Sequence, residues 1–128
     1  MARTTRQPGE NPLIWIGSSK SDLMEFPSAV IYEIGSALGE AQFGGKSLNA
    51  KPWKGEGSGV LEIVDDYRGD TYRAVYTIRF ENAVYVLHAF QKKSTRGHKT
   101  SLSDVWLIHQ RLREAREDYQ ARHDKTKK

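Results

Sequence analysis

The chain has 128 residues, of which 38% are hydrophobic and 28% are charged, and its formal net charge is +4. This length fits one domain, and the absence of cysteine excludes a disulfide scaffold and a thiolate metal site. No apolar run reaches the roughly 20 residues of a membrane span, and the N-terminal residues lack the apolar stretch of a signal peptide. We therefore expect a soluble cytoplasmic protein that does not enter a membrane.

The first half of the chain predicts an arm, a strand and two helices. The arm is polar and contains Pro and Gly, whereas the next four residues are β-prone and end at Gly17. Pro27 should end a short helix and is well suited to begin a longer one, which Gly44-Gly45 stops. These four elements cover residues 1–12, 13–16, 18–26 and 27–43.

The second half predicts a loop, three strands and a long helix. Residues 46–59 are rich in Gly and Lys and indicate the loop. Residues 71–80 alternate with the period of two typical of a strand, and Glu81-Asn82 reads as a two-residue turn. A basic loop at 91–100 leads to the helix. The predicted strands cover residues 60–64, 71–80 and 83–90, and the helix runs from Leu102 to about Arg122 with an apolar stripe at Val105, Ile108, Leu112, Ala115 and Tyr119.

The predicted order β-α-α-β-β-β-α indicates an α+β fold with an antiparallel sheet. A helix cannot bury an apolar stripe alone, so we expect the helices to pack on one face of the sheet and to leave the other face open. The domain should span residues 13–122, between the arm at 1–12 and a basic tail at 123–128.

Positive charge gathers at the C-terminal end. Residues 1–90 hold 9 Lys/Arg and 11 Asp/Glu, a net charge of −2, whereas residues 91–128 hold 11 Lys/Arg and 5 Asp/Glu, a net charge of +6. This asymmetry indicates an acidic partner, most often nucleic acid. A solvated basic helix and tail is the alternative.

The hairpin around Glu81-Asn82 predicts which side chains share a face, because directly opposed residues do. A two-residue turn places Arg73 and His88 as diagonal neighbours, about 7–8 Å apart, on the face expected to be open. Lys92 continues the same side just past the strand end. The opposite face is the expected core, with Tyr72, Ala74, Tyr76, Ile78, Phe80, Ala83, Tyr85, Leu87 and Ala89.

Two cations beside an imidazole suit the cleavage of RNA. The ribose 2′-OH must lose a proton, the phosphate gathers negative charge, and the departing oxygen must gain a proton. Arg73 and Lys92 would stabilise the phosphate charge, and His88 would transfer a proton. Clustered cations lower a lysine pKa, which makes Lys92 or Lys93 a candidate base. The four histidines lack metal-ligand spacing with acids, so we expect no metal and no cofactor.

Each candidate also has a structural interpretation. His88 is alternatively a half-buried strand histidine, and Lys92 and Lys93 are alternatively part of a solvated loop. Arg73 alternatively forms an ordinary ion pair with a nearby carboxylate. Its alternative partners are Asp65, Asp66 and Asp70.

Further candidates for RNA binding lie outside the hairpin. Lys51 and Lys54 flank Pro52-Trp53, and cations beside an aromatic ring suit stacking on RNA, whereas a lid on the core is the alternative for Trp53. Arg68, in the turn before the hairpin, and Lys93 and His98, in the basic loop, complete this group.

Three stretches together carry a resemblance: Lys51-Pro-Trp-Lys-Gly, Tyr67-Arg-Gly-Asp-Thr-Tyr-Arg-Ala-Val-Tyr-Thr and His88-Ala-Phe-Gln-Lys-Lys-Ser94. They resemble the RelE/HigB superfamily of toxin–antitoxin toxins, in particular its phage-derived HigB-like branch. The likeness spans residues from about Leu13 to Tyr119.

The resemblance implies a small RelE-like fold and a ribosome-associated mRNA endonuclease that halts translation. It also implies a cognate antitoxin of the helix-turn-helix type. The Arg of the family's Tyr-Arg strand motif falls on Arg73, and the basic positions after the last strand fall on Lys92 and Lys93. Where related toxins often carry basic residues on the preceding strand, this chain has Glu62 and Val64.

We therefore expect an endoribonuclease toxin with Arg73, His88 and Lys92 as its catalytic residues. Two alternatives stay open. One is a module that binds RNA or an antitoxin without cutting, and the other is a structural partner of an antitoxin that acts in repression.

Overall fold

The computed structural model describes residues 7–92 and 100–124, which form one sheet and three helices. The predicted α+β class and the predicted order of elements are confirmed, with one added strand. The elements are β1 (Leu13–Trp15), α1 (Ser19–Met24), α2 (Ser28–Gln42), β2 (Ala50–Pro52), β3 (Val60–Tyr67), β4 (Asp70–Thr77), β5 (Val84–Lys92) and α3 (Leu102–Asp124).

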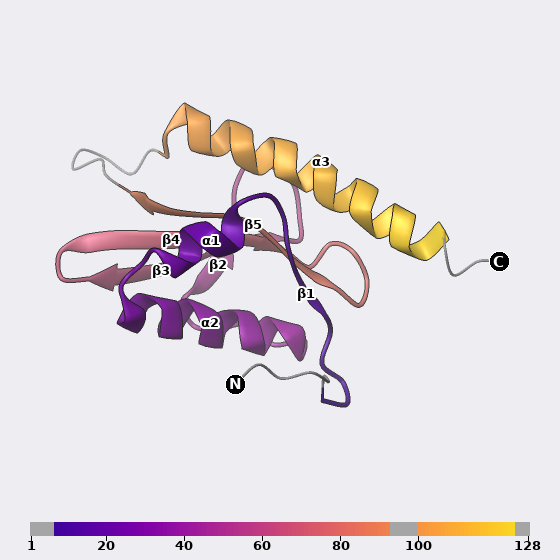
Figure 1. The fold of residues 1–128 in the computed structure, drawn as a ribbon, viewed down its shortest axis with the longest axis horizontal. Coiled ribbons are helices and arrows are strands. Elements are labelled where there is room, and N and C mark those ends of the chain that lie inside the picture. The colour runs from indigo at the N-terminus through magenta and orange to yellow at the C-terminus, as the bar shows by residue number, and fades with distance from the viewer. Residues whose placement is uncertain (1–6, 93–99, 125–128) are drawn as a thin grey trace.

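The five strands lie in the order β1-β5-β4-β3-β2 (Figure 1). The pairs formed by β2 to β5 are antiparallel, as expected, whereas β1 runs parallel to β5. No tight turn joins β1 to β5, so the chain is free to bring them together in the parallel sense. The sheet is therefore mixed, with a parallel pair at one edge.

The added strand β2 corrects the expectation of a loop throughout residues 46–59. Lys51 pairs with Glu62 across the β2–β3 ladder. A three-residue edge strand that ends in Pro52 carries little local signal, because Pro and Lys are typical of exposed edges and of loops alike. Its pairing brings the Lys51 segment beside the central strands.

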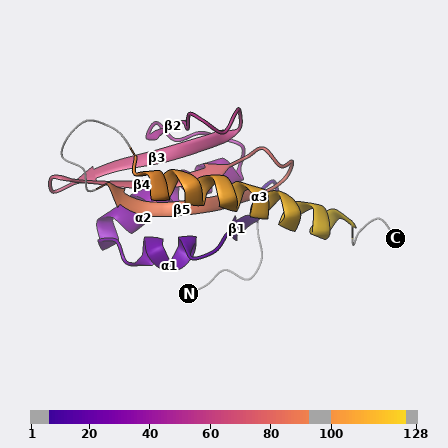
Figure 2. The ribbon, with the colours of Figure 1, turned by 90° about the horizontal axis from the view of Figure 1, so that it is seen from above.

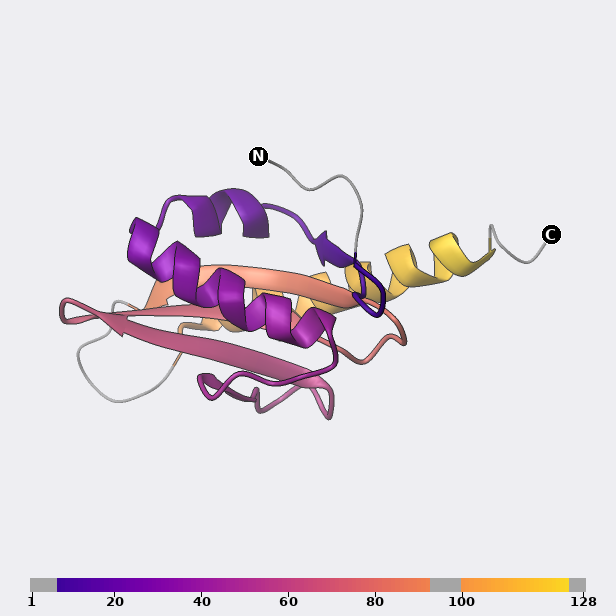
Figure 3. The ribbon, with the colours of Figure 1, turned by 90° about the horizontal axis from the view of Figure 1, so that it is seen from below.

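Helices cover both faces of the sheet, which corrects the expectation that one face stays open. Helix α2 lies along one face and α3 along the other (Figures 2 and 3). On the α3 face, Val75 and Leu87 are fully buried against Ile108 and Leu112. The stripe of α3 needs an apolar partner, and the hairpin offers one on this side as well. The buried core of the α2 face includes Val30, Ile34, Leu38, Ile63, Ala74 and Tyr76.

A β-bulge between Val75 and Tyr76 changes the predicted faces of β5. Val75 pairs with His88, as the two-residue turn predicts, but Tyr76 pairs with Val86. The bulge places one extra residue in β5. The β5 side chains between the turn and the bulge therefore lie on the face opposite to the predicted one. Strand β4 also ends at Thr77, so the connection to β5 is longer than a two-residue turn. The α3 face therefore holds Phe80, Ala83, Tyr85 and Leu87, the α2 face holds Val84 and Val86, and Ile78 is exposed.

Helix α3 has 23 residues, and its C-terminal end extends beyond the sheet (Figure 1). It buries Ile108, Leu112 and Ala115, whereas Leu102, Val105 and Trp106 in its first turns are exposed apolar side chains. Within residues 7–92 and 100–124, no helix combines the length and the apolar character needed to cross a membrane.

Candidate functional site

A cleft of about 490 Å³ opens on the α3 face, between β2 and the first turn of α3. It is lined by three cationic side chains: Lys51 and Lys54 from the β2 segment and Arg73 from β4. Trp53 and Val105 contribute apolar walls. Because β2 pairs with β3 and β3 with β4, residues distant in sequence meet in this cleft.

Trp53 serves the core as well as the cleft. The residue is 7% exposed and packs into the α3-face core, as the lid interpretation predicts. Lys51 and Lys54, by contrast, are exposed, and neither forms an ion pair within residues 7–92 and 100–124. The two lysines are therefore available to an anionic ligand.

Arg73 lines this cleft but is largely buried, and it forms an ion pair with Glu62. Arg73 Nη1 donates to Glu62 Oε1 at 2.5 Å, and the two side chains are 11% and 9% exposed. Glu62 lies opposite Val75 in the β3–β4 ladder, so it stands diagonally beside Arg73 on the same face. The partner of Arg73 is thus Glu62, and not one of the three aspartates that the sequence offered.

The guanidinium of Arg73 retains donor capacity. Its Nε is buried and has no hydrogen-bond partner within the described residues. A guanidinium has five N–H donors, and a buried donor without a partner carries a free-energy penalty of about 1–3 kcal/mol. A ligand oxygen would remove this penalty once the side chains around Nε shift to admit it.

Lys92 lies beside the cleft cations. It pairs with Thr71, two residues along the ladder from the Arg73–Phe90 pair, and therefore shares their face. Burial lowers the pKa of the Lys92 amine, and the positive charges of Arg73 and Lys51 lower it further, against an opposing effect of Glu62. The neutral amine is thereby made more accessible, as a general base requires.

His88 shares the α3 face with Arg73 but does not line the cleft, because α3 covers it. The residue is 5% exposed, and its ring stacks on Phe90 with centroids 4.8 Å apart. Its Nε2 lies 2.6 Å from Asp104 Oδ1, and its Nδ1 lies 3.2 Å from Arg111 Nη1. Since a guanidinium only donates, Nδ1 accepts, and Nε2 carries the proton toward Asp104. Both ring nitrogens are thus occupied.

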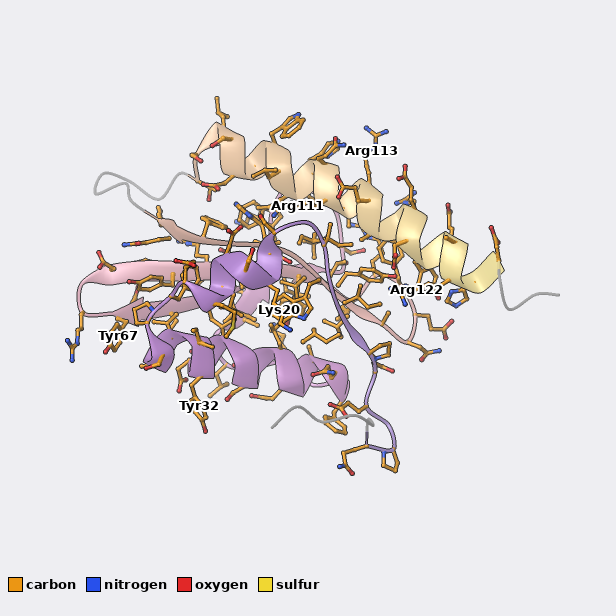
Figure 4. All side chains as sticks on the ribbon, in the orientation of Figure 1. Lys20, Tyr32, Tyr67, Arg111, Arg113 and Arg122 are labelled. Carbon is orange, nitrogen blue, oxygen red and sulfur yellow. The ribbon has the colours of Figure 1, made fainter. Side chains whose placement is uncertain are left out.

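Arg111 ties this network to the start of α1. Its Nη1 also donates to the carbonyl of Leu87 at 3.1 Å, and its Nη2 donates to Ser18 Oγ at 3.0 Å. Gly17 leaves room for the guanidinium, because a Cβ there would lie 2.8 Å from Arg111 Nε. Figure 4 shows Arg111 directed from α3 toward α1. The His88 network therefore fastens the first half of α3 to the sheet.

The remaining predicted residues lie elsewhere. Arg68 sits in the β3–β4 turn with a positive φ of 51° and stacks over the Tyr67 ring at 5.3 Å. Lys93 and His98 lie outside the described residues. Within the described part of the chain, no group of three or more His, Cys, Asp or Glu residues is arranged to hold a metal ion.

Sequence reasoning gave no role to Glu62, Asp104 or Arg111, although it noted Glu62 where related toxins often carry a basic residue. A register for β3 would have found Glu62, since it falls diagonally from Arg73. Asp104 carries a local signal, because Ser101 Oγ accepts from its backbone N–H at 3.2 Å in the manner of a helix cap. Arg111 gives no such signal, because only the packing of α3 on β5 brings it to His88.

Comparisons with known proteins find a matching family model and similar solved structures. A family model described as "Phage derived protein Gp49-like (DUF891)" matches residues 21–113. A chain of the crystal structure of the toxin–antitoxin complex RelBE2 from Mycobacterium tuberculosis is similar, with 21% identity and a TM-score of 0.44. That likeness covers 65% of this chain and 99% of the other. No curated protein sequence matches the chain.

Proposed function

Since this chain belongs to the phage-derived Gp49-like family, we propose that it is the toxin of a type II toxin–antitoxin system and cleaves mRNA to stop translation. The family matches the phage-derived part of the resemblance seen in the sequence, and the HigB-like branch stays a prediction. The cleft at Arg73 is the proposed RNA site.

The observation that carries the proposal is the convergence of Lys51, Lys54 and Arg73 on one cleft, with Lys92 beside them. Arg and Lys side chains bind phosphate through charge-assisted hydrogen bonds, and Arg does so with a planar fork. The free donor capacity of Arg73 supports a ligand with several acceptor oxygens. A phosphodiester is such a ligand.

The proposed reaction needs three roles from this chain. Lys92, with its lowered pKa, takes the proton of the 2′-OH, whose oxygen then attacks the neighbouring phosphorus. Arg73 stabilises the charge on the phosphate oxygens as the bond to the departing 5′-oxygen breaks, and that oxygen takes up a proton from the solvent to leave as a 5′-hydroxyl. Lys51 and Lys54 hold the flanking phosphates. The proton-transfer role of His88 stays a prediction.

The partners follow from the same proposal. The substrate is mRNA on the ribosome, and a cognate antitoxin of the helix-turn-helix type blocks the toxin. The antitoxin and the ribosome rest on the resemblance of the three sequence stretches to the RelE/HigB superfamily.

A module that binds RNA without cutting it is the second candidate. One observation favours it: α3 encloses His88, the imidazole expected to transfer a proton, and both of its ring nitrogens are engaged. Product formation separates the two candidates, because a binder retains salt-sensitive RNA affinity and yields no new RNA ends.

The test is expression of the chain alone, with growth and RNA ends as readouts. Wild type should arrest growth and produce mapped cuts in mRNA, and Arg73→Gln should lower cleavage at least about 100-fold. Because Arg73 is buried, the exposed pair Lys51→Gln/Lys54→Gln serves as a second variant, and Lys20→Gln on α1 is the control. Full toxicity of both cleft variants would show that the cleft is not the site.

A further inference from the structure

A second cleft, of about 440 Å³, lies along the same flank of α3 as the first. Val105 lines the first cleft, and Arg113 and Arg116, two to three turns further along the helix, line the second. The segment after β2 forms the facing wall of both, with Lys54 in the first and Glu56 in the second. The two clefts therefore follow one another along one seam between α3 and this segment.

The wall of the second cleft is held in place by its own contacts. His109 Nδ1 lies 3.1 Å from one Glu56 carboxylate oxygen and 3.3 Å from the other. Arg79 Nε donates to the carbonyl of Ser58 at 3.0 Å, and Arg79 Nη2 donates to the carbonyls of Ser58 and Glu56. Arg79 thus organises the segment, and the Glu56 carboxylate faces His109.

Arg113 and Arg116 have no comparable structural task. Both are exposed, and neither forms an ion pair or a side-chain hydrogen bond within residues 7–92 and 100–124. Figure 4 shows Arg113 directed away from the sheet, unlike Arg111. Glu117 is the one carboxylate of α3 that lines this cleft within the described residues. The second cleft therefore offers two cations that protein groups do not use.

We propose that the second cleft binds the sugar–phosphate backbone of the same RNA strand, beyond the nucleotides held at Arg73. This inference rests on the proposed function. At 1.5 Å per residue, α3 rises about 16 Å from Val105 to Arg116, and single-strand sites in proteins commonly span about 4–16 nucleotides. Arginines that contact phosphate extend the affinity for RNA without reading its sequence.

The length of the RNA separates the two clefts experimentally. A 4-nucleotide RNA is expected to reach the first cleft only, whereas a 12-nucleotide RNA is long enough to reach both. The two lengths lie within the common range of about 4–16 nucleotides for single-strand sites. The double variant Arg113→Gln/Arg116→Gln removes the two free cations. Its control, Lys20→Gln/Lys46→Gln, changes the net charge equally at two exposed lysines outside both clefts. Fluorescence anisotropy at several salt concentrations measures the affinity of each protein variant for each of the two RNAs.

The double variant should bind the 12-nucleotide RNA about tenfold more weakly, with a salt slope smaller by about 1.4, and should bind the 4-nucleotide RNA as wild type does. Equal loss for both RNAs, loss in the control, or no loss at all would overturn the inference. An octaglutamate peptide serves as an acidic protein probe. If the double variant loses affinity for this peptide as much as for the 12-nucleotide RNA, the cleft would instead be assigned to an acidic protein partner. If wild type neither binds nor cuts RNA, the proposed function fails as well, and that result is distinct from the others.

Discussion

His88 Nε2 lies 2.6 Å from Asp104 Oδ1, and this contact joins the central hairpin to the first turn of the helix that covers it. Asp104 uses its second carboxylate oxygen to accept from Ser101 Oγ at 2.6 Å, so one carboxylate connects the helix cap with β5. Thr100 and Val105, which flank these residues in sequence, line the first cleft. The contact therefore sets the position of one cleft wall.

The first prediction concerns the role of His88. His88→Gln and Asp104→Asn should each lower the free energy of unfolding by about 1–3 kcal/mol, because each leaves a buried polar group poorly paired. If His88 positions α3, both variants should lose RNA cleavage to a similar and modest extent, within about tenfold. Denaturant unfolding and a cleavage assay on the same samples measure both effects. A loss of 100-fold or more in His88→Gln, with Asp104→Asn active, would show proton transfer by His88 instead.

The second prediction concerns competition between Glu62 and RNA for Arg73. Glu62→Gln removes the negative charge that holds the guanidinium, so RNA affinity should rise several-fold and the salt slope should increase by about 0.7. The same variant should be less stable, since Arg73 stays buried without its counter-charge. Anisotropy with a short RNA measures the affinity. Weaker binding by a folded Glu62→Gln variant would show that Arg73 does not contact the phosphate.

The third prediction concerns the pH dependence of cleavage. The pKa of Lys92 lies below the ordinary lysine value of 10.5, chiefly through burial, so the fraction of neutral amine should grow as the pH rises toward that lowered pKa. The cleavage rate should therefore increase with pH over the alkaline range and then level off. Lys92→Arg keeps the charge but cannot give up a proton, and it should lower cleavage about 100-fold while RNA affinity stays within about twofold. An unchanged pH profile in Lys92→Arg would exclude Lys92 as the base.

The fourth prediction concerns the second half of α3. Tyr85 Oη donates to Asp118 Oδ2 at 2.7 Å, and Arg122 Nε donates to the same oxygen at 2.6 Å. Burial by itself would raise the pKa of Asp118, but these two hydrogen bonds outweigh it and lower the pKa below 3.8. Tyr85→Phe should lower the free energy of unfolding by about 1 kcal/mol at neutral pH.

The sign of the pH effect follows from the lowered pKa of Asp118. A carboxyl whose folded pKa is depressed contributes stability above its unfolded pKa and loses it as the pH falls through the folded pKa. The difference between wild type and Tyr85→Phe should thus be constant near neutrality and shrink below about pH 4. Urea unfolding at a series of pH values measures it. A difference that does not change with pH would contradict the charge-assisted character of this bond.

The sequence by itself determined the type of each predicted helix and strand and the register of the hairpin at Val75, but it missed the edge strand β2. Alternation in residues 71–80 and the stripe of the last helix are local patterns, and they placed α3 and the start of β4, whereas β4 ends at Thr77 and not at residue 80. The pairing of Val75 with His88 followed from counting residues across a turn. The basic phrase around Lys51-Pro-Trp-Lys also indicated the cations that line the first cleft.

Only the tertiary structure decided which face each helix covers and which groups pair with the cations. The bulge in β5 offsets the alternation by one residue, and no local preference announces such an offset. Once Tyr85 and Leu87 turn to the second face, that face is apolar enough to bury α3, and His88 is enclosed with Asp104 and Arg111. The ion pair between Glu62 and Arg73 also depends on tertiary structure. Contacts between strands depend on their register, and the register depends on the whole sheet.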